Sequence, residues 1–213
     1  MYNDIDSLFK PMVVVTGFGP FLKHPVNASW EGVKLMNKEE LEEKHNIELV
    51  QIEMPVTYDN VDEFVPPLWA THTPKLMIHV GVSHLAEHLT LETMAHRKGY
   101  QRKDYFDKIP ANCACPAEGA IRLHTKLNVE KICQEFNENP PDKCVTAVQS
   151  CDAGRFLCEY IYYTSLSIDN RRTLFVHVPD FDKYPSERTA RALEKITSLC
   201  LEQVDVMDCS EES

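Results

Sequence analysis

Long hydrophobic runs are absent from this sequence. Its longest purely apolar stretches, such as Met12–Val15, have strand length, far below the roughly 20 residues that a membrane-spanning helix needs. The start, Met1–Lys10, carries acidic residues and lacks the basic-then-apolar order of a signal peptide. We therefore expect a cytoplasmic, cytosolic protein without a membrane partner, in which residues 1–10 form a loose extension.

An excess of basic residues is absent as well, since 22 Lys and Arg stand against 33 Asp and Glu, a formal net charge of −11. Phosphate binding needs clustered basic side chains, so nucleic acid is excluded as the main partner. Without a secretion signal, the eight cysteines are expected to be thiols. No repeat or linker divides the chain. We therefore expect one catalytic domain over residues 1–213, with 205–213 as a second loose terminus.

Short apolar, β-branched runs alternate with segments of helical periodicity. The predicted strands are Met12–Thr16, Ile47–Ile52, Leu76–Gly81, Cys144–Gln149 and Thr173–Val178. The predicted helices are Ser29–Lys44, Val61–Ala70, Val129–Phe136, Arg155–Ser167 and Ser186–Val204. This alternation predicts an α/β fold, a three-layer α/β/α sandwich with a mostly parallel central sheet.

Binding sites in such open sheets form beyond the carboxyl ends of the strands. The rule points to residues 17–27, 84–92, 150–158 and 177–180. The stretch Tyr100–Lys126 has little periodicity, and long irregular stretches inside a domain are commonly functional lids or ordered loops.

A turn between a strand and a helix predicts a reactive cysteine. Gly154 permits an unusual backbone, and a helix is expected to begin near Arg155, which places Cys158 in its first turn. Free N–H groups and the helix dipole favour a thiolate there, and the same N–H groups suit an oxyanion. On this segment alone, a buried structural cysteine is the alternative interpretation.

His177 ends an apolar strand, where an open sheet delivers side chains to its site edge. A neutral imidazole there can take the proton of a thiol and later protonate a leaving amine. Glu92 closes a short alternating stretch, and its carboxylate can orient the imidazole and stabilise its cation. Taken singly, a hydrogen-bonded core histidine and an exposed glutamate are the alternatives.

Phe18 and Phe21 lie in the sequence Gly-Phe-Gly-Pro-Phe at 17–21. Two rings beside such a turn suit a flat apolar slot, whereas a strand-ending turn with two core phenylalanines is the alternative. The stretch lacks G-x-G-x-x-G, and no phosphate-binding lysine follows it, so it is not a nucleotide-binding loop.

Together these segments resemble the pyroglutamyl peptidase I family, the pyrrolidone-carboxylate peptidases, and its animal-type members in particular. The resemblance runs from Val13 to about Glu202. Its motifs are Val-Thr-Gly-Phe-Gly-Pro-Phe at 15–21, Asn-Ala-Ser-Trp at 27–30, His-Val-Gly-Val-Ser at 79–83, Thr-Leu-Glu at 90–92, Lys-Gly-Tyr at 98–100, Asp-Ala-Gly-Arg-Phe-Leu-Cys at 152–158, Tyr-Tyr-Thr-Ser-Leu at 162–166 and Phe-Val-His-Val-Pro at 175–179.

The resemblance implies a cysteine exopeptidase that removes N-terminal pyroglutamyl residues from peptides through a thioacyl-enzyme, without cofactor or metal. It implies Cys158 as nucleophile, His177 as base and Glu92 as third member of the triad. The substrate-binding residues that it implies are Phe18, Phe21, Leu157, Val82 and Asn27. A cyclised N-terminus has no ammonium group, which suits an apolar aromatic slot. We expect a monomer acting on pyroglutamyl peptides and leave a homo-oligomer open.

Some positions depart from the common family pattern. Val82 stands where bacterial members carry Gln, His84 where a Gly is frequent, and Glu159 where Asn or Asp commonly follows the nucleophile. The stretch Arg102–Lys126 does not match the bacterial pattern, which leaves Arg97 and Lys98 as nearby candidates for a basic site residue. These departures predict changes in rate and leaving-peptide preference rather than in reaction class.

Three alternatives remain open from the sequence. The first is another thiol amidase or esterase with the same triad but a different acyl pocket. The second is a catalytically silent binding homologue. The third is a metal protein, suggested by Cys113, Cys115 and His96, although this spacing is no standard zinc pattern and no second pair follows.

Overall fold

The computed structural model describes residues 10–21 and 25–211, so most of the expected N-terminal extension lies outside the described residues. The elements in chain order are β1 (Met12–Phe18), α1 (Ala28–Lys34), α2 (Lys38–His45), β2 (Glu48–Met54), α3 (Tyr58–His72), β3 (Leu76–Val82), β4 (Leu89–Glu92), β5 (Met94–His96), the 3-10 helix η2 (Ala111–Cys113), β6 (Arg122–His124), α4 (Val129–Glu138), β7 (Ala147–Ser150), α5 (Leu157–Ile168), β8 (Thr173–Val178) and α6 (Ser186–Glu211).

The central sheet has the strand order β2-β1-β3-β8-β4-β7. Strands β2, β1, β3 and β8 are parallel to one another, whereas β4 pairs antiparallel with β8 and parallel with β7. The sheet is therefore mixed but mostly parallel, and the predicted fold class is confirmed. The direction of β4 and β7 is the part that strand periodicity did not reveal.

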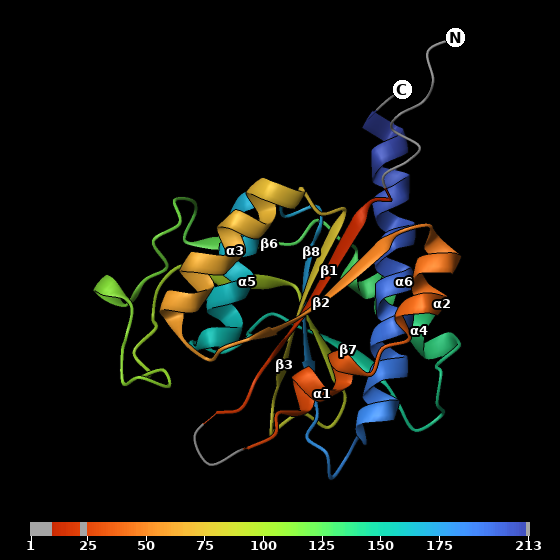
Figure 1. Cartoon of the computed structure of the whole chain (residues 1–213), viewed down its shortest axis with the longest axis horizontal. Helices are drawn as coiled ribbons and strands as arrows, with labels where there is room; N and C mark the ends of the chain where they lie inside the picture. The colour runs from red at the N-terminus through yellow and green to blue at the C-terminus, as the bar shows by residue number, and fades with distance from the viewer. Residues whose placement is uncertain (1–9, 22–24, 212–213) are drawn as a thin grey trace.

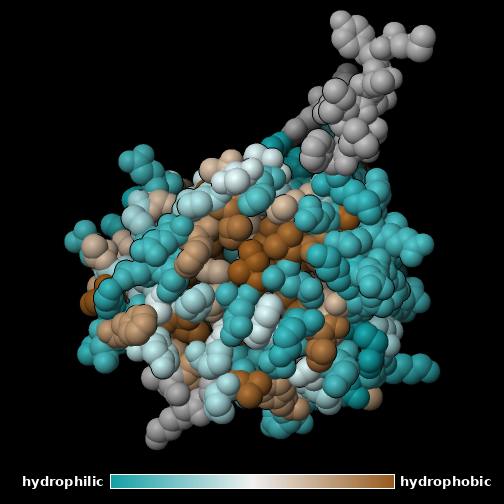
Figure 2. Space-filling view, viewed as in Figure 1, coloured by the Kyte–Doolittle hydropathy of each residue, from teal (hydrophilic) through white to brown (hydrophobic). Residues whose placement is uncertain are grey.

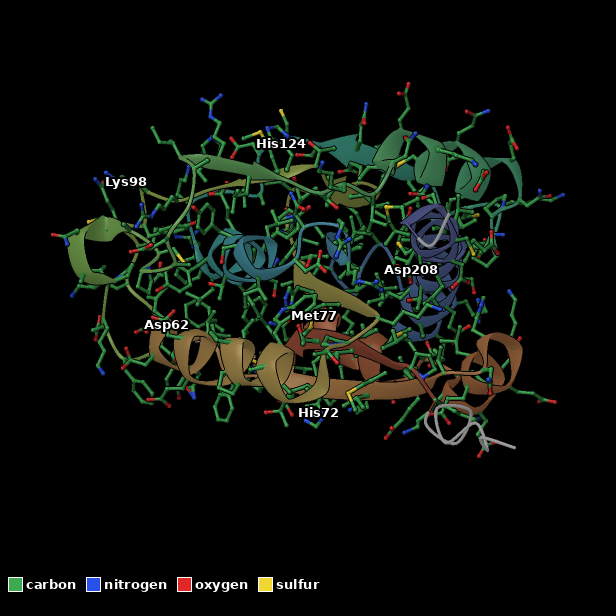
Figure 3. All side chains as sticks on the ribbon, turned by 90° about the horizontal axis from the view of Figure 1, so that it is seen from above. Asp62, His72, Met77, Lys98, His124 and Asp208 are labelled. Carbon is green, nitrogen blue, oxygen red and sulfur yellow. The ribbon has the colours of Figure 1, made fainter. Side chains whose placement is uncertain are left out.

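Helices cover both faces of this sheet (Figure 1). Along β1, Val13 and Val15 join the apolar cluster beneath α1, α4 and α6, while Val14 joins the cluster beneath α3 and α5. This alternation explains the continuous apolar run of β1, because both faces of the strand are buried. Seen from above, α5 lies between α3 and the ribbon of β5 and β6 (Figure 3).

Two predicted helices differ from the observed ones. The segment Ser29–Lys44 forms two helices, because Asn37 caps α2 by accepting a hydrogen bond from Glu40 N at 3.2 Å. At the other end, α6 continues past Val204 to Glu211, so residues 205–211 are helical rather than loose. Met207 packs against the core cluster and extends the apolar face of this helix.

The irregular stretch after β5 is an ordered loop. The backbone of Cys113 accepts hydrogen bonds from Gly99 N at 2.9 Å and Tyr100 N at 3.1 Å, and Arg97 O accepts one from Cys115 N at 2.9 Å. Tyr100 is fully buried. Backbone pairing to the loop's own residues, rather than a long helix or strand, explains why the sequence shows no period here.

Candidate active site

Cys158 is the second residue of α5, in its first turn, as the sequence predicted. Its sulfur lies over Gly81 of β3: a Cβ atom added at Gly81 would stand 2.8 Å from Cys158 Sγ and 2.8 Å from Phe175 Cζ. Real Cβ contacts are never so short, so a side chain at position 81 would displace the sulfur or the ring. Gly81 is therefore a site residue that sequence analysis missed, although it stands within the motif His-Val-Gly-Val-Ser.

The turn before α5 sets the direction of the helix. Gly154 has φ of +76°, a conformation that favours glycine. Its carbonyl accepts a hydrogen bond from Phe156 N at 2.8 Å, and its own N–H donates to Asp152 Oδ1 at 3.2 Å. The N–H groups of a first helical turn have no acceptor within the helix. Those of Leu157 and Cys158 can therefore donate hydrogen bonds to an anionic oxygen near the start of α5.

His177 and Glu92 come from the antiparallel pair β8 and β4. Thr90 of β4 pairs directly with His177 of β8, so these two side chains lie on the same face of the sheet. Glu92 is two residues further along β4, so it lies on that face as well, diagonally across from His177. The imidazole Nδ1 donates to Glu92 Oε1 at 2.8 Å. The antiparallel direction of β4 thus places this carboxylate beside the imidazole.

Both groups are buried, with His177 8% and Glu92 1% exposed. Burial alone lowers the pKa of His177, but hydrogen bonds to Cys158 and Glu92, together with their charges, raise it from 6.5 to about 10. The direction of this shift favours the protonated imidazole of His177. The second oxygen of Glu92, Oε2, is buried without a hydrogen-bond partner.

These residues lie in a cleft of about 700 Å³. Its lining includes all eight residues that the sequence predicted for the site: Phe18, Phe21, Asn27, Val82, Glu92, Leu157, Cys158 and His177. The structure therefore brings the predicted triad and the predicted pocket residues to one place.

The segment around β1 and α1 builds the aromatic end of the cleft. A Cβ atom at Gly17 would stand 2.7 Å from Trp30 Cα, so glycine allows α1 to pack directly on β1. Ser29 Oγ accepts a hydrogen bond from Phe18 N at 3.0 Å, and Asn27 Nδ2 donates to Gly19 O at 3.0 Å. Asn27 also caps α1 through Ser29 N at 3.1 Å. The amide group of Asn27 thus holds the loop that carries the rings.

Two further residues complete this end of the cleft. Phe156, which directly precedes α5, has its ring 5.7 Å from that of Phe21, and the guanidinium of Arg102 lies 4.2 Å from the centroid of Phe156. Sequence analysis missed both residues. The two basic residues that the sequence suggested, Arg97 and Lys98, do not line the cleft, whereas Arg102 does. No sequence signal separated Arg102 from the other basic residues of an irregular loop, whereas Phe156 was adjacent to Leu157.

Glu159, which follows Cys158 in α5, is the buried centre of an ionic cluster. Its side chain is wholly buried and accepts hydrogen bonds from His96 Nδ1 at 2.8 Å and from Arg155 Nη1 at 2.7 and 2.8 Å. Arg155 Nη1 also donates to Asp152 Oδ1 at 2.8 Å. Burial raises the pKa of Glu159, and its partners oppose that shift. The cluster connects the turn before α5 to the edge strand β5.

The residues that suggested a metal serve other contacts. His96 binds Glu159 through Nδ1, and its Nε2 lies 3.3 Å from Arg155 Nη2. Cys115 Sγ is buried 3.4 Å from Thr164 Oγ1. Within residues 10–21 and 25–211, no group of three or more His, Cys, Asp or Glu side chains is arranged to hold a metal ion.

Comparison with known proteins yields consistent matches. The family model for pyroglutamyl peptidase matches residues 11–207. The chain is 40% identical over 203 residues to pyroglutamyl-peptidase 1 of Homo sapiens, covering 95% of this chain and 94% of that protein. It is 40% identical over 188 residues to pyroglutamyl-peptidase 1 of Rattus norvegicus, covering 88% of each.

Solved structures share the fold. The chain superposes on the pyroglutamyl peptidase I of Bacillus amyloliquefaciens with a TM-score of 0.78 at 22% identity, covering 91% of this chain and 98% of that one. For the pyrrolidone carboxyl peptidase of Thermus thermophilus the TM-score is 0.73 at 24% identity, covering 87% and 98%. At this identity the likeness concerns the fold alone.

Proposed function

This chain belongs to the pyroglutamyl peptidase family, and from that premise we propose that it is a cysteine exopeptidase removing N-terminal pyroglutamyl residues from peptides. The proposed catalytic residues are Cys158, His177 and Glu92. The observation that carries the proposal is the convergence of Glu92, His177 and Cys158 in a cleft with an aromatic end, where Glu92 Oε1 lies 2.8 Å from His177 Nδ1. We further propose that residues 1–213 form one catalytic domain.

The first half of the reaction uses His177 as an acid. The thiolate of Cys158 attacks the carbonyl carbon of the pyroglutamyl residue, and the C=O electron pair moves onto oxygen. The N–H groups of Leu157 and Cys158 stabilise this oxyanion. As it collapses, the C–N bond breaks and His177 gives its proton to the leaving amine. The products are a thioacyl-enzyme and the shortened peptide.

The second half uses His177 as a base. Having lost its proton, the imidazole takes one from water, whose oxygen attacks the thioester carbon. The C–S bond breaks, free pyroglutamate leaves, and the thiolate and imidazolium are restored. Throughout both steps Glu92 holds Nδ1–H and stabilises the positive ring, without itself bonding to substrate.

The aromatic end supports specificity for a cyclised N-terminus. Apolar surface for a small lactam comes from the rings of Phe18, Phe21 and Phe156. Leu157, which is buried, lines the same cleft. An ammonium group in that position would be desolvated between rings without an acidic partner. We therefore propose that peptides beginning with Gln or Glu are poor substrates. The proposed role of Asn27 is to hold the backbone of Gly19, which directly follows Phe18.

The decisive experiment is hydrolysis of pyroglutamyl-aminomethylcoumarin by wild type, Cys158→Ala and Cys151→Ala. Cys151 is exposed on the same turn and is the matched control. Cys158→Ala is expected to lose all measurable turnover with little change in thermal stability. Cys151→Ala should keep wild-type rates, and iodoacetamide should inactivate both active proteins. Substantial activity in Cys158→Ala would refute the assignment of the nucleophile.

A panel of acyl-aminocoumarins separates this proposal from its alternatives. A general thiol amidase or esterase would cleave acetyl or glutaminyl compounds at rates comparable with the pyroglutamyl compound. A silent binding homologue would cleave none of them.

The proposed function also includes a cellular compartment and an oligomeric state. Among the described residues no helix has the length and apolar composition needed to cross a bilayer. The described residues include all eight cysteines, and no disulfide joins any of them, which supports a reducing compartment such as the cytosol. We also propose that a monomer is active on pyroglutamyl peptides, since Cys158, His177 and Glu92 of a single chain already lie together at one cleft.

A further inference from the structure

One large apolar side chain is exposed at the cleft. Leu85, on the loop that follows β3, is 92% exposed, more than any other large hydrophobic residue of the described chain. It also lines the cleft that holds Cys158 and His177. An exposed leucine elsewhere on a protein surface is ordinary, but one that lines a cleft is available to a ligand that fills that part of the cleft.

Leu85 stands on a turn that the chain holds in place. Ser83 N donates to Val178 O at 2.9 Å, and Ala86 N donates back to Ser83 O at 3.0 Å, which closes the turn. Because Val178 directly follows His177, the first of these bonds fixes the turn to the strand that carries the catalytic base.

Side chains add two more connections to the loop after β8. His84 Nδ1 lies 2.8 Å from Asp180 Oδ2, and Lys183 forms a salt bridge with Glu87. These contacts hold the turn on both sides of Leu85. The side chain is therefore presented to solvent by a supported turn, so a ligand that covers it has little loop entropy to overcome.

The leaving peptide passes the same place. His177 gives its proton to the leaving amine, so the chain that departs begins beside β8, next to the turn. The cleft of about 700 Å³ lies within the range of pockets that enclose drug-sized molecules, far larger than one five-membered lactam. With the lactam at the aromatic end, the rest of the cleft is open to the residue that follows it.

We propose that Leu85 is a specificity-determining residue, forming an apolar subsite for the side chain that directly follows pyroglutamate. This inference rests on the proposed function. The preferred residues at that position are aliphatic or aromatic ones such as Leu and Phe, because they cover Leu85 and remove apolar surface from water, whereas glycine leaves it exposed.

The test compares kcat/KM for pyroglutamyl-leucine amide and pyroglutamyl-glycine amide. Wild type should prefer the leucine substrate, and Leu85→Ala should reduce that preference by about 3- to 10-fold, as expected for partial burial of one leucine. The rate on the glycine substrate should fall less than the rate on the leucine substrate. Leu85→Met should retain the preference, and Ile121→Ala, which removes an exposed residue outside the cleft, should not alter it.

An unchanged ratio in Leu85→Ala would refute the subsite while leaving the proposed function intact, because wild type would still cleave both substrates. Cleavage of neither substrate by wild type would overturn the proposed function and the subsite together. Thermal unfolding of Leu85→Ala should match wild type, since the side chain that it removes is almost fully exposed.

Discussion

At the scale of single residues, the carboxylate of Glu92 stabilises the charge on His177. The pKa of His177 rises from 6.5 to about 10 in the folded chain, so the stabilisation from this charge is complete below pH 6.5 and is lost as pH rises through 10. Glu92→Gln removes one cause of that rise. Because Cys158 is the larger cause of the raised pKa, we expect the variant to be less stable than wild type at pH 7 by about 1 to 2 kcal/mol, and the difference to shrink by pH 10.5.

Thermal unfolding at both pH values, followed by circular dichroism, measures this difference. Lys131 and Glu135 form an exposed pair at 3.5 Å and supply a control. Glu135→Gln should differ little from wild type at either pH. A stability difference between Glu92→Gln and wild type that grew with pH would contradict the assignment of a charged His177.

Gly81 affects the same site because it leaves space for neighbouring atoms, not because of charge. Gly81→Ala places a methyl group 2.8 Å from the positions of Cys158 Sγ and Phe175 Cζ, so the proposed nucleophile, the ring or both must move. Because small misplacements of reacting atoms are costly, kcat should fall at least about 100-fold. Gly32→Ala is the matched control, since its methyl group would meet Thr189 Cγ2 at 2.5 Å, between α1 and α6. That variant should lose stability but keep kcat when assayed below its melting temperature.

At the scale of elements, the cluster around Glu159 joins α5 to β5. Glu159→Ala would leave Arg155 and His96 without their buried acceptor, and we expect a loss of about 2 to 3 kcal/mol in unfolding free energy. Glu159→Gln keeps an oxygen acceptor and should lose less. Urea titration measures both, and equal stability of Glu159→Ala and wild type would show that the cluster contributes no net stabilisation.

At the scale of the whole molecule, the sheet ends in an exposed edge at β2. Apolar surface gathers over the region of β2 and α3 in Figure 2, with hydrophilic side chains around it. The strand also carries two exposed acids, Glu48 and Glu53, and charges on an edge strand oppose pairing with a second copy. We therefore expect a monomer of 24.5 kDa in sedimentation velocity at micromolar concentration. A species of twice that mass, persisting on dilution, would contradict this.

Much of this molecule was determined by its sequence alone. Strand-like and helix-like periods predicted the layered α/β fold, and the turn residues before Cys158 predicted its place in the first turn of a helix, because a residue's period and cap depend on its near neighbours. The motifs also identified all eight predicted residues that line the cleft.

Only the tertiary structure decided how distant segments meet. The antiparallel direction of β4 brings Glu92 to His177, and the close approach of α5 to β3 requires glycine at position 81. The tertiary structure likewise decided that Arg102 lies over Phe156 and that Leu85 lines the cleft. Local sequence carries no record of these contacts, because strand direction and neighbours through space follow from burying the whole sheet on both faces at once.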